Sequence, residues 1–194
     1  MQKKIKQLLL GFLIIFIGLG LLIYENNYQR NKIRENETRI YNFINNAGPA
    51  IIDNNQKQYD YIAVLKIPTI NLKRGLVATD NYYNNVDYNL EIIKGSQMPI
   101  IMNSNLIIVG HNGNSDISFF RNLSRLKKGD KIYLYYQNQR FQYMLDHFYE
   151  DSKNGYANII RDFSKTTITL ITCKRNNPYK QLVFIAYLVN QYDI

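Results

Sequence analysis

A single cysteine and two histidines are the side chains of this chain best suited to nucleophilic chemistry. Cys173 ends the apolar, β-prone stretch 169–173. His111 follows the apolar stretch 106–109 and one glycine. A thiol attacks as the thiolate, so a nucleophilic cysteine needs a base or an ion-pair partner close by. Reactive groups tend to lie where a rigid strand meets solvent, and each of these two strands presents one half of a Cys/His pair at its exit.

Each of these residues also has a purely structural interpretation. Free cysteine is among the most buried residue types, so Cys173 could be a core thiol. A lone thiol in a secreted domain is nevertheless a candidate nucleophile. The second histidine, His147, lies inside the alternating stretch 141–149 without a turn beside it. We interpret His147 as structural and expect its substitution to leave activity largely intact.

Further motifs accompany the Cys/His pair in a fixed order. They are AVLKIPTINL at 63–72, GSQMP at 95–99, GH at 110–111, FFRNL at 119–123, LKKGDKI at 126–132 and TLITC at 169–173. Together they resemble the sortases, the cell-wall cysteine transpeptidases of Gram-positive bacteria. The similarity covers roughly residues 61–189 and rests on several ordered motifs, which makes it far more specific than a lone TC dipeptide.

The resemblance implies a fold and a reaction. Sortases fold as an eight-stranded β-barrel. In the family reaction, Cys173 would attack the Thr-Gly carbonyl of an LPxTG-like sorting signal on a surface protein or pilin, and His111 would protonate the leaving amine. A peptidoglycan-precursor amine or a pilin lysine would then resolve the thioacyl enzyme. We expect no metal or organic cofactor, because no Cys/His cluster has zinc-site spacing and no dense carboxylate cluster supports a calcium site.

The chain departs from the family at the third catalytic position. Sortases carry an arginine five residues before a small residue in the strand after the cysteine, and counting back from Ala186 gives Gln181, with Lys180 beside it. We favour Arg175 as the replacement, because its guanidinium keeps a bidentate donor. Arg175 could instead be an exposed loop charge. Asn112 and Thr172, which flank the pair in sequence, are candidates to support its two side chains.

The N-terminal region predicts a membrane anchor. Residues 1–7 are basic, and residues 8–24 form an uninterrupted apolar or glycine stretch of 17 residues. This stretch is short for a spanning helix and long for a signal-peptide core, and no small-x-small cleavage site follows it. We predict an uncleaved anchor with a cytoplasmic N-terminus, with a cleaved signal peptide as the alternative. We predict a juxtamembrane helix and then a polar linker, which begins at residue 53, within residues 25–58. The catalytic domain is expected at residues 59–194.

Short β-type stretches separated by turns predict a mostly β barrel or sandwich over the catalytic domain. The expected strands are 61–67, 72–77, 91–93, 105–109, 131–136, 140–149, 166–172 and 182–189, with brief helices at 82–86 and 117–123.

The charge of the chain limits its partners. The net charge is +9, but no nucleic-acid-binding module accompanies it and the basic residues are scattered. We therefore expect a basic surface beside anionic lipid headgroups and wall polymers, and no nucleic acid partner. Two other functions stay open: a membrane-tethered barrel that binds sorting signals without turnover, and a plain cysteine peptidase.

Overall fold

The computed structural model describes residues 2–45 and 60–194, which fall into two compact units that divide after Tyr41. The polar linker predicted from residue 53 up to residue 58 lies outside the described residues.

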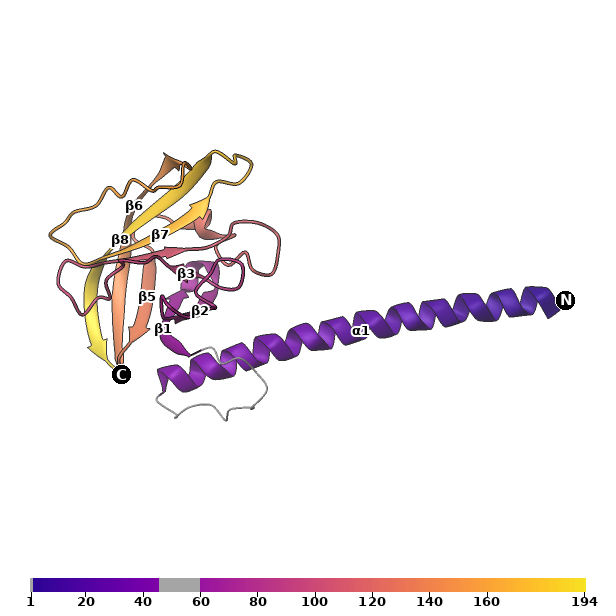
Figure 1. Cartoon of the computed structure of the whole chain (residues 1–194). Helices are drawn as coiled ribbons and strands as arrows, with labels where there is room; N and C mark the ends of the chain where they lie inside the picture. Colours follow the sequence, from indigo (N-terminus) through magenta and orange to yellow (C-terminus); the bar gives the residue numbers. More distant parts are fainter. Residues whose placement is uncertain (1, 46–59) are drawn as a thin grey trace. The chain divides into compact units, whose positions relative to one another are not determined.

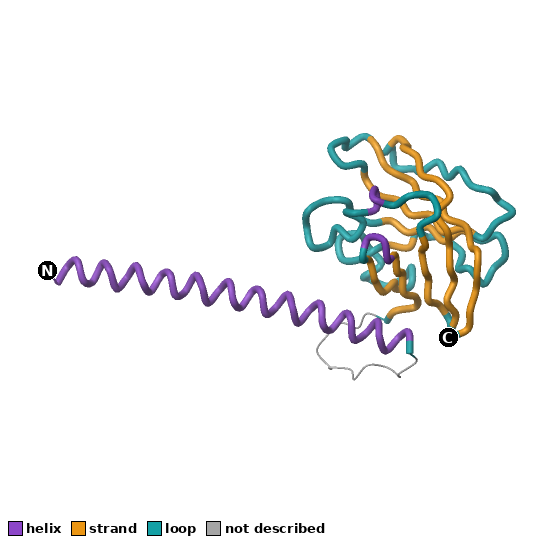
Figure 2. Tube along the Cα trace, turned by 180° about the vertical axis from the view of Figure 1, so that it is seen from behind, coloured by secondary structure: helices purple, strands orange, loops and turns teal. Residues whose placement is uncertain are grey.

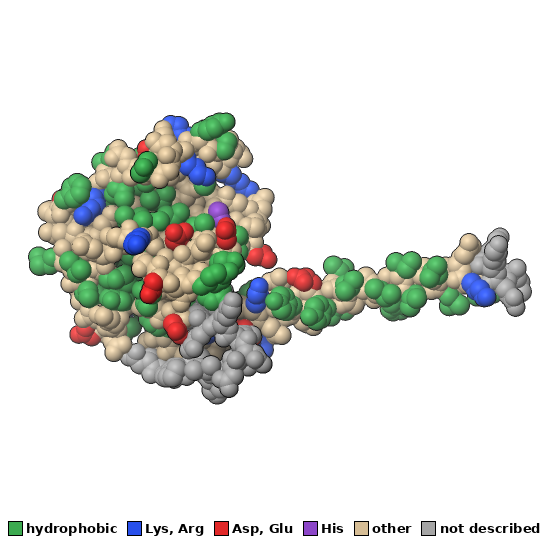
Figure 3. All heavy atoms as spheres, viewed as in Figure 1, with side chains coloured by type: hydrophobic (Ala, Val, Ile, Leu, Met, Phe, Trp, Pro, Cys, Tyr) green, Lys and Arg blue, Asp and Glu red, His purple; other side chains and the backbone are tan. Residues whose placement is uncertain are grey.

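The first unit is formed by the continuous helix α1 (Gln2–Ile44), whose residues from Asn42 onward are counted with the second unit. The sequence predicts an anchor followed by a juxtamembrane helix, and the described helix runs through both stretches. No proline interrupts the polar stretch that follows Tyr24, so the backbone hydrogen bonds continue without a break. Large apolar side chains cover the surface of its N-terminal half (Figure 3). Among the described residues this helix alone is long and apolar enough to cross a membrane.

The second unit is an eight-stranded, nearly closed barrel (Figures 1 and 2). The spatial order of the strands is β2-β1-β5-β6-β8-β7-β4-β3. The pair β4 and β7 is parallel, and every other described pair is antiparallel. The strands are β1 (Tyr61–Ile67), β2 (Leu72–Val77), β3 (Glu91–Ile92), β4 (Asn105–Val109), β5 (Lys131–Tyr136), β6 (Gln139–Ser152), β7 (Thr167–Cys173) and β8 (Lys180–Asp193).

All eight predicted strands are present, and β1, β2, β4 and β5 have the predicted bounds. The strands β6 and β8 are much longer than predicted. They pair with each other along their whole length, from Gln139↔Asp193 to Ser152↔Lys180. A polar stretch can be a strand when a neighbouring strand supplies its backbone hydrogen bonds. The alternation of apolar residues in the sequence cannot predict such pairing.

No helix is present at 82–86, and the stretch predicted at 117–123 is turn or irregular up to residue 122 and reaches a 3-10 helix only at Leu123. In the first, the side chains of Asn81 and Asn85 accept hydrogen bonds from the backbone N–H groups of Tyr83 and Asp87, each at 2.9 Å. Such bonds compete with helix formation. The described short helices are instead the 3-10 turns η1 (Pro68–Ile70) and η2 (Leu123–Arg125).

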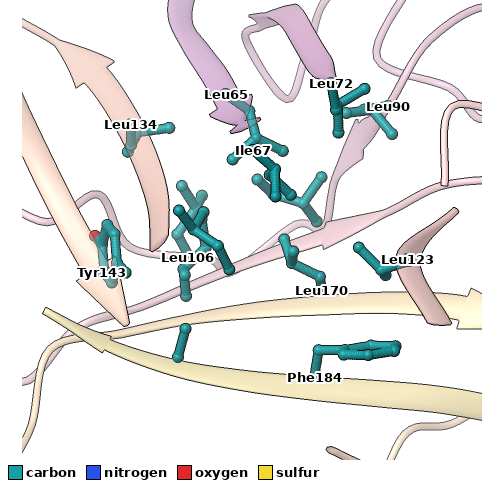
Figure 4. Packing of buried hydrophobic residues seen from close by; sticks show 14 of the residues in the cluster. Leu65, Ile67, Leu72, Leu90, Leu106, Leu123, Leu134, Tyr143, Leu170 and Phe184 are labelled. Atoms are coloured by element: carbon teal, nitrogen blue, oxygen red, sulfur yellow. The ribbon is translucent and has the colours of Figure 1, made fainter. Parts of the chain in front are cut away.

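Apolar side chains from the barrel strands fill the barrel interior. Figure 4 shows members of this cluster from β1, β4, β7 and β8 pointing toward one another, among them Leu65, Leu106, Leu170 and Phe184. The ends of the strand order approach each other through buried Asn89, whose amide donates to the Gly75 carbonyl at 3.0 Å.

A second, smaller apolar cluster lies on the opposite face of β7 and β8. It contains Ile171, Val183 and Ile185, and the segment 153–166 packs Ala157 and Ile159 against it. Both faces of β7 are therefore buried, which explains its nearly continuous apolar sequence.

Candidate active site

His111 and Cys173 leave the barrel at the same end of two neighbouring strands. The strands β4 and β7 run parallel, and their register ends at the pair Val109↔Ile171. Each residue follows its last paired position by two. The Gly110 N–H continues the ladder by donating to the Ile171 carbonyl at 3.1 Å. Parallel strands bring their carboxyl ends to one edge, so the structure brings the predicted pair together.

Two side chains tie these strand exits to each other. The hydroxyl of Thr172 is buried and donates to the Gly110 carbonyl at 2.7 Å. The amide of Asn112 donates to the Cys173 carbonyl at 2.9 Å. Both residues were candidates from the sequence, and both bonds cross between the histidine strand and the cysteine strand. They fix the backbone on either side of the pair.

The backbone of His111 is also held from the barrel interior. A Cβ atom on Gly110 would lie 2.5 Å from Leu90 Cδ2 and 2.9 Å from Phe120 Cδ2, so only glycine fits there without displacing a neighbour. The Phe120 N–H donates to the His111 carbonyl at 3.0 Å. The glycine of the Gly-His motif is therefore required by close packing.

The imidazole of His111 faces a carboxylate that sequence reasoning missed. Nε2 lies 3.6 Å from Asp87 Oδ1, which is within ion-pair range when the ring is protonated. The imidazole is 39% exposed, so solvent reaches it. Asp87 lies in the turn region between β2 and β3, and no local pattern marks it as a neighbour of the histidine.

The thiol of Cys173 has a cationic neighbour that was also missed. The ammonium of Lys153 donates to Sγ at 3.3 Å. The thiol itself is partly exposed. Lys153 follows the last residue of β6, 20 residues before Cys173, and its sequence context is that of an ordinary loop lysine.

Gln181, which stands at the position of the family arginine by sequence count, lies directly opposite Cys173 in the β7–β8 register. Its side-chain amide is already engaged: it donates to the Tyr156 carbonyl at 2.7 Å, to Asp151 Oδ2 at 3.1 Å and to the Ser152 carbonyl at 3.2 Å. The backbone N–H of Asn158 and the Gln181 amide together lower the pKa of the Asp151 carboxyl. Gln181 thus fastens the segment after β6.

Of the other two candidates, Arg175 lies on the turn between β7 and β8, and Lys180 stands where this turn ends. Nη2 of Arg175 donates to Asn114 Oδ1 at 2.9 Å, which brings its guanidinium to the loop that follows His111. The turn is closed by the Lys174 N–H donating to the Lys180 carbonyl at 2.9 Å. Lys180 opens β8 and pairs with Ser152 of β6.

His147 lies on β6, and groups outside the Cys/His pair hold its ring. Nδ1 lies 2.8 Å from Asp146 Oδ2, and Nε2 lies 3.2 Å from the Ile160 carbonyl. The ring also stacks on Tyr149, with centroids 5.8 Å apart.

Within residues 2–45 and 60–194, no group of three or more His, Cys, Asp or Glu side chains is placed to hold a metal ion.

Comparisons with known proteins agree with this architecture. A family model described as the sortase domain matches residues 65–189. Sortase A of Bacillus anthracis is 29% identical over 112 residues, which are 58% of this chain and 51% of that protein, so the chain spans about half the length of this curated relative.

Solved structures show the same fold. Sortase A from Corynebacterium diphtheriae matches with a TM-score of 0.60 at 22% identity, covering 86% of this chain and 90% of that one. Sortase C of Streptococcus pneumoniae matches with a TM-score of 0.61 at 20% identity, covering 84% and 90%.

Proposed function

Because the chain belongs to the sortase family, we propose that it is a cysteine transpeptidase with Cys173 as nucleophile and His111 as general acid. One observation carries this proposal. The hydrogen bonds of Thr172 and Asn112 join the exits of β4 and β7, so the thiol and the imidazole share one edge of a rigid sheet. Rigid positioning of a nucleophile and its partner is what covalent catalysis requires.

The reaction follows from these two groups. The Cys173 thiolate attacks a peptide carbonyl carbon, a C–S bond forms and the negative charge moves to the carbonyl oxygen. The C–N bond then breaks, and protonated His111 gives its proton to the leaving amine. Asp87 Oδ1 lies 3.6 Å from Nε2, within ion-pair distance of the imidazolium that donates this proton. An incoming amine attacks the thioester, returns a proton to His111 and releases the thiolate.

The substrates we propose are those of the family. The first is an LPxTG-like sorting signal on a surface protein or pilin, and the second is a cell-wall precursor amine or a pilin lysine. Arg175 is the donor we propose for the substrate and its oxyanion. Its support is the bond to Asn114, which turns the guanidinium toward the loop that carries His111.

Membrane anchoring forms part of the proposal. The apolar segment 8–24 of α1 would span the membrane, with residues 1–7 in the cytoplasm and the catalytic domain outside. Its support is the length and apolar surface of α1 together with the lysines that precede the apolar stretch. Such an anchor would keep the enzyme beside substrates that are themselves held at the membrane.

The test is single-turnover acylation of Cys173 by a sorting-signal peptide, followed by mass spectrometry. We expect a thioester that hydroxylamine removes, and an adduct with a supplied amine in the second half-reaction. Cys173→Ala and His111→Ala should abolish the product, whereas the control His147→Ala should retain it. Peptide binding without a thioester would show a tethered binding barrel, and a thioester that only water resolves would show a plain peptidase.

A further inference from the structure

Lys153 is held at a defined point beyond the end of β6. The last pair of the β6–β8 ladder is Ser152↔Lys180, and the Lys153 N–H extends it by donating to the Tyr179 carbonyl at 2.9 Å. The Gln181 amide also donates to the Ser152 carbonyl, one residue before Lys153. The backbone of Lys153 is therefore fixed by the end of the β6–β8 ladder, before the loop begins.

The strand register explains why its side chain reaches the thiol. Asp151 of β6, Gln181 of β8 and Cys173 of β7 form one row across three neighbouring strands. Directly opposed residues share a face of the sheet, and so do residues two apart on one strand. Lys153, two residues after Asp151, thus lies on the face that carries Cys173. The ammonium nitrogen Nζ of its long side chain lies 3.3 Å from Sγ.

The nearby carboxylates have other hydrogen-bond donors. Asp151 Oδ2 accepts from the Asn158 N–H at 2.8 Å and from the Gln181 amide. The Glu150 carboxylate pairs with Lys174. The Lys153 ammonium is directed instead at the sulfur. Charged groups lie on each element around the thiol. They are His111 after β4, Asp87 between β2 and β3, Glu150 and Asp151 on β6, Lys174 and Arg175 on the β7–β8 turn, and Lys180 at the start of β8.

We propose that Lys153 is a catalytic residue that stabilises the Cys173 thiolate by a direct charge-assisted hydrogen bond. This inference rests on the proposed function and assigns a residue that the family motifs do not contain. The thiol proton passes to His111, and Lys153 stays protonated throughout. Its charge holds the sulfur ionised until the C–S bond forms, and again when the acceptor amine expels the thiolate. The positive charge beside the sulfur thus comes from the residue that follows β6. Gln181 occupies the β8 position opposite Cys173.

The test uses the full chain in detergent and a neutral alkylating agent, iodoacetamide, which reports on Cys173 alone because the chain has no other cysteine. In Lys153→Met the midpoint of the alkylation rate against pH should move up by about one pH unit, the shift expected when a single ion-pair partner is lost. Lys153→Arg should keep the wild-type midpoint. Lys174→Met is the matched control: it removes the same charge next to Cys173, but from an ammonium that lies on Glu150, and should leave the midpoint unchanged.

The outcomes separate this inference from the proposed function, because iodoacetamide needs neither a sorting signal nor an acceptor. Equal midpoints in wild type and Lys153→Met would overturn the role of Lys153, whatever the peptide assay shows. An equal shift of the midpoint in Lys153→Arg or in Lys174→Met would also overturn it. The shift would then not depend on whether a cation lies beside Sγ. A shifted midpoint in a protein that no peptide acylates would support the Lys153 contact and contradict the transpeptidase assignment.

Discussion

At the residue scale, Gly110 shows how a small side chain places a larger one. Leu90 and Phe120 occupy the space that a side chain at position 110 would need, directly before His111. A single methyl group at this position would force these buried side chains to move. Overpacking of this kind typically costs about 1–3 kcal/mol.

Gly110→Ala should therefore lower the free energy of unfolding by about 1–3 kcal/mol, measured by urea denaturation. The same substitution should cost less in a Leu90→Ala background, because the Cδ2 atom 2.5 Å from the added methyl is gone. Additive effects of the two substitutions would show that the clash with Leu90 is not the cause.

Arg175 is the second test at this scale. If its guanidinium donates to the substrate oxyanion, Arg175→Ala should lower kcat/KM for a sorting-signal peptide by about 10² or more, and Arg175→Lys should recover little. Gln181→Ala should lower it much less, because the Gln181 amide is committed to Tyr156, Asp151 and Ser152. The iodoacetamide rate should not change in Arg175→Ala. Wild-type peptide kinetics in that variant would reject Arg175 as the donor.

At the scale of elements, the segment between β6 and β7 has no regular secondary structure, yet side chains satisfy much of its backbone. The Tyr149 hydroxyl accepts from the Ile160 N–H at 2.8 Å, and the Tyr187 hydroxyl accepts from the Asp162 N–H at 2.8 Å. Arg161 donates to the Asn103 carbonyl at 3.2 Å. The segment that carries Lys153 at its start is thus fastened to β6, β8 and the loop before β4.

At low pH, protonation of the Asp162 carboxylate should destabilise this segment. Its carboxylate accepts from the hydroxyl and the N–H of Ser164 at 2.6 and 2.9 Å and pairs with Lys165, and these contacts lower its pKa to about 2. Because this folded-state pKa is lower than the unfolded-state value near 4, the ionised carboxylate stabilises the fold above about pH 4. This stabilisation is lost as the pH falls from about 4 toward 2. The hydrogen-exchange protection factors of residues 153–166, which are corrected for the intrinsic exchange rate at each pH, should therefore fall between about pH 4 and pH 2.

The variants define the source of this effect. Asp162→Asn should exchange faster than wild type at pH 5, and the difference should vanish near pH 2. Ser164→Ala removes the hydroxyl donor that contributes most to the low pKa of Asp162, so the loss of protection should begin at a higher pH than in wild type. Parallel pH profiles for wild type and Asp162→Asn would assign the acid sensitivity to another group.

At the scale of the whole molecule, the barrel unit contains its own core. Every member of the two apolar clusters comes from Ile62 or later in the chain. A chain that begins at Asp53 should therefore be soluble, show the circular dichroism of a β protein and acylate at Cys173 as fast as the full chain in detergent. Aggregation of the shorter chain, or slower acylation, would show that α1 is needed for the domain to fold or function.

The anchor proposal makes a separate prediction about orientation. A membrane-impermeant maleimide should label Cys173 on intact cells, because the apolar part of α1 would leave the barrel outside. In a Cys173→Ala background, a cysteine introduced as Gln2→Cys should react only after lysis. The reverse pattern would show the opposite topology.

The sequence by itself determined the strands whose apolar alternation is local, the glycine-histidine and threonine-cysteine exits, and the long apolar N-terminal segment. Periodicity and turn chemistry act over a few residues, so β1, β2, β4 and β5 could be predicted at their observed bounds. Only the tertiary structure decided what surrounds the thiol. Lys153 reaches Cys173, and Gln181 contacts the segment after β6, because β6, β8 and β7 pair in one register. Asp87 faces His111 from the turn before β3, which pairs with β4. These pairings join segments that are distant in the sequence.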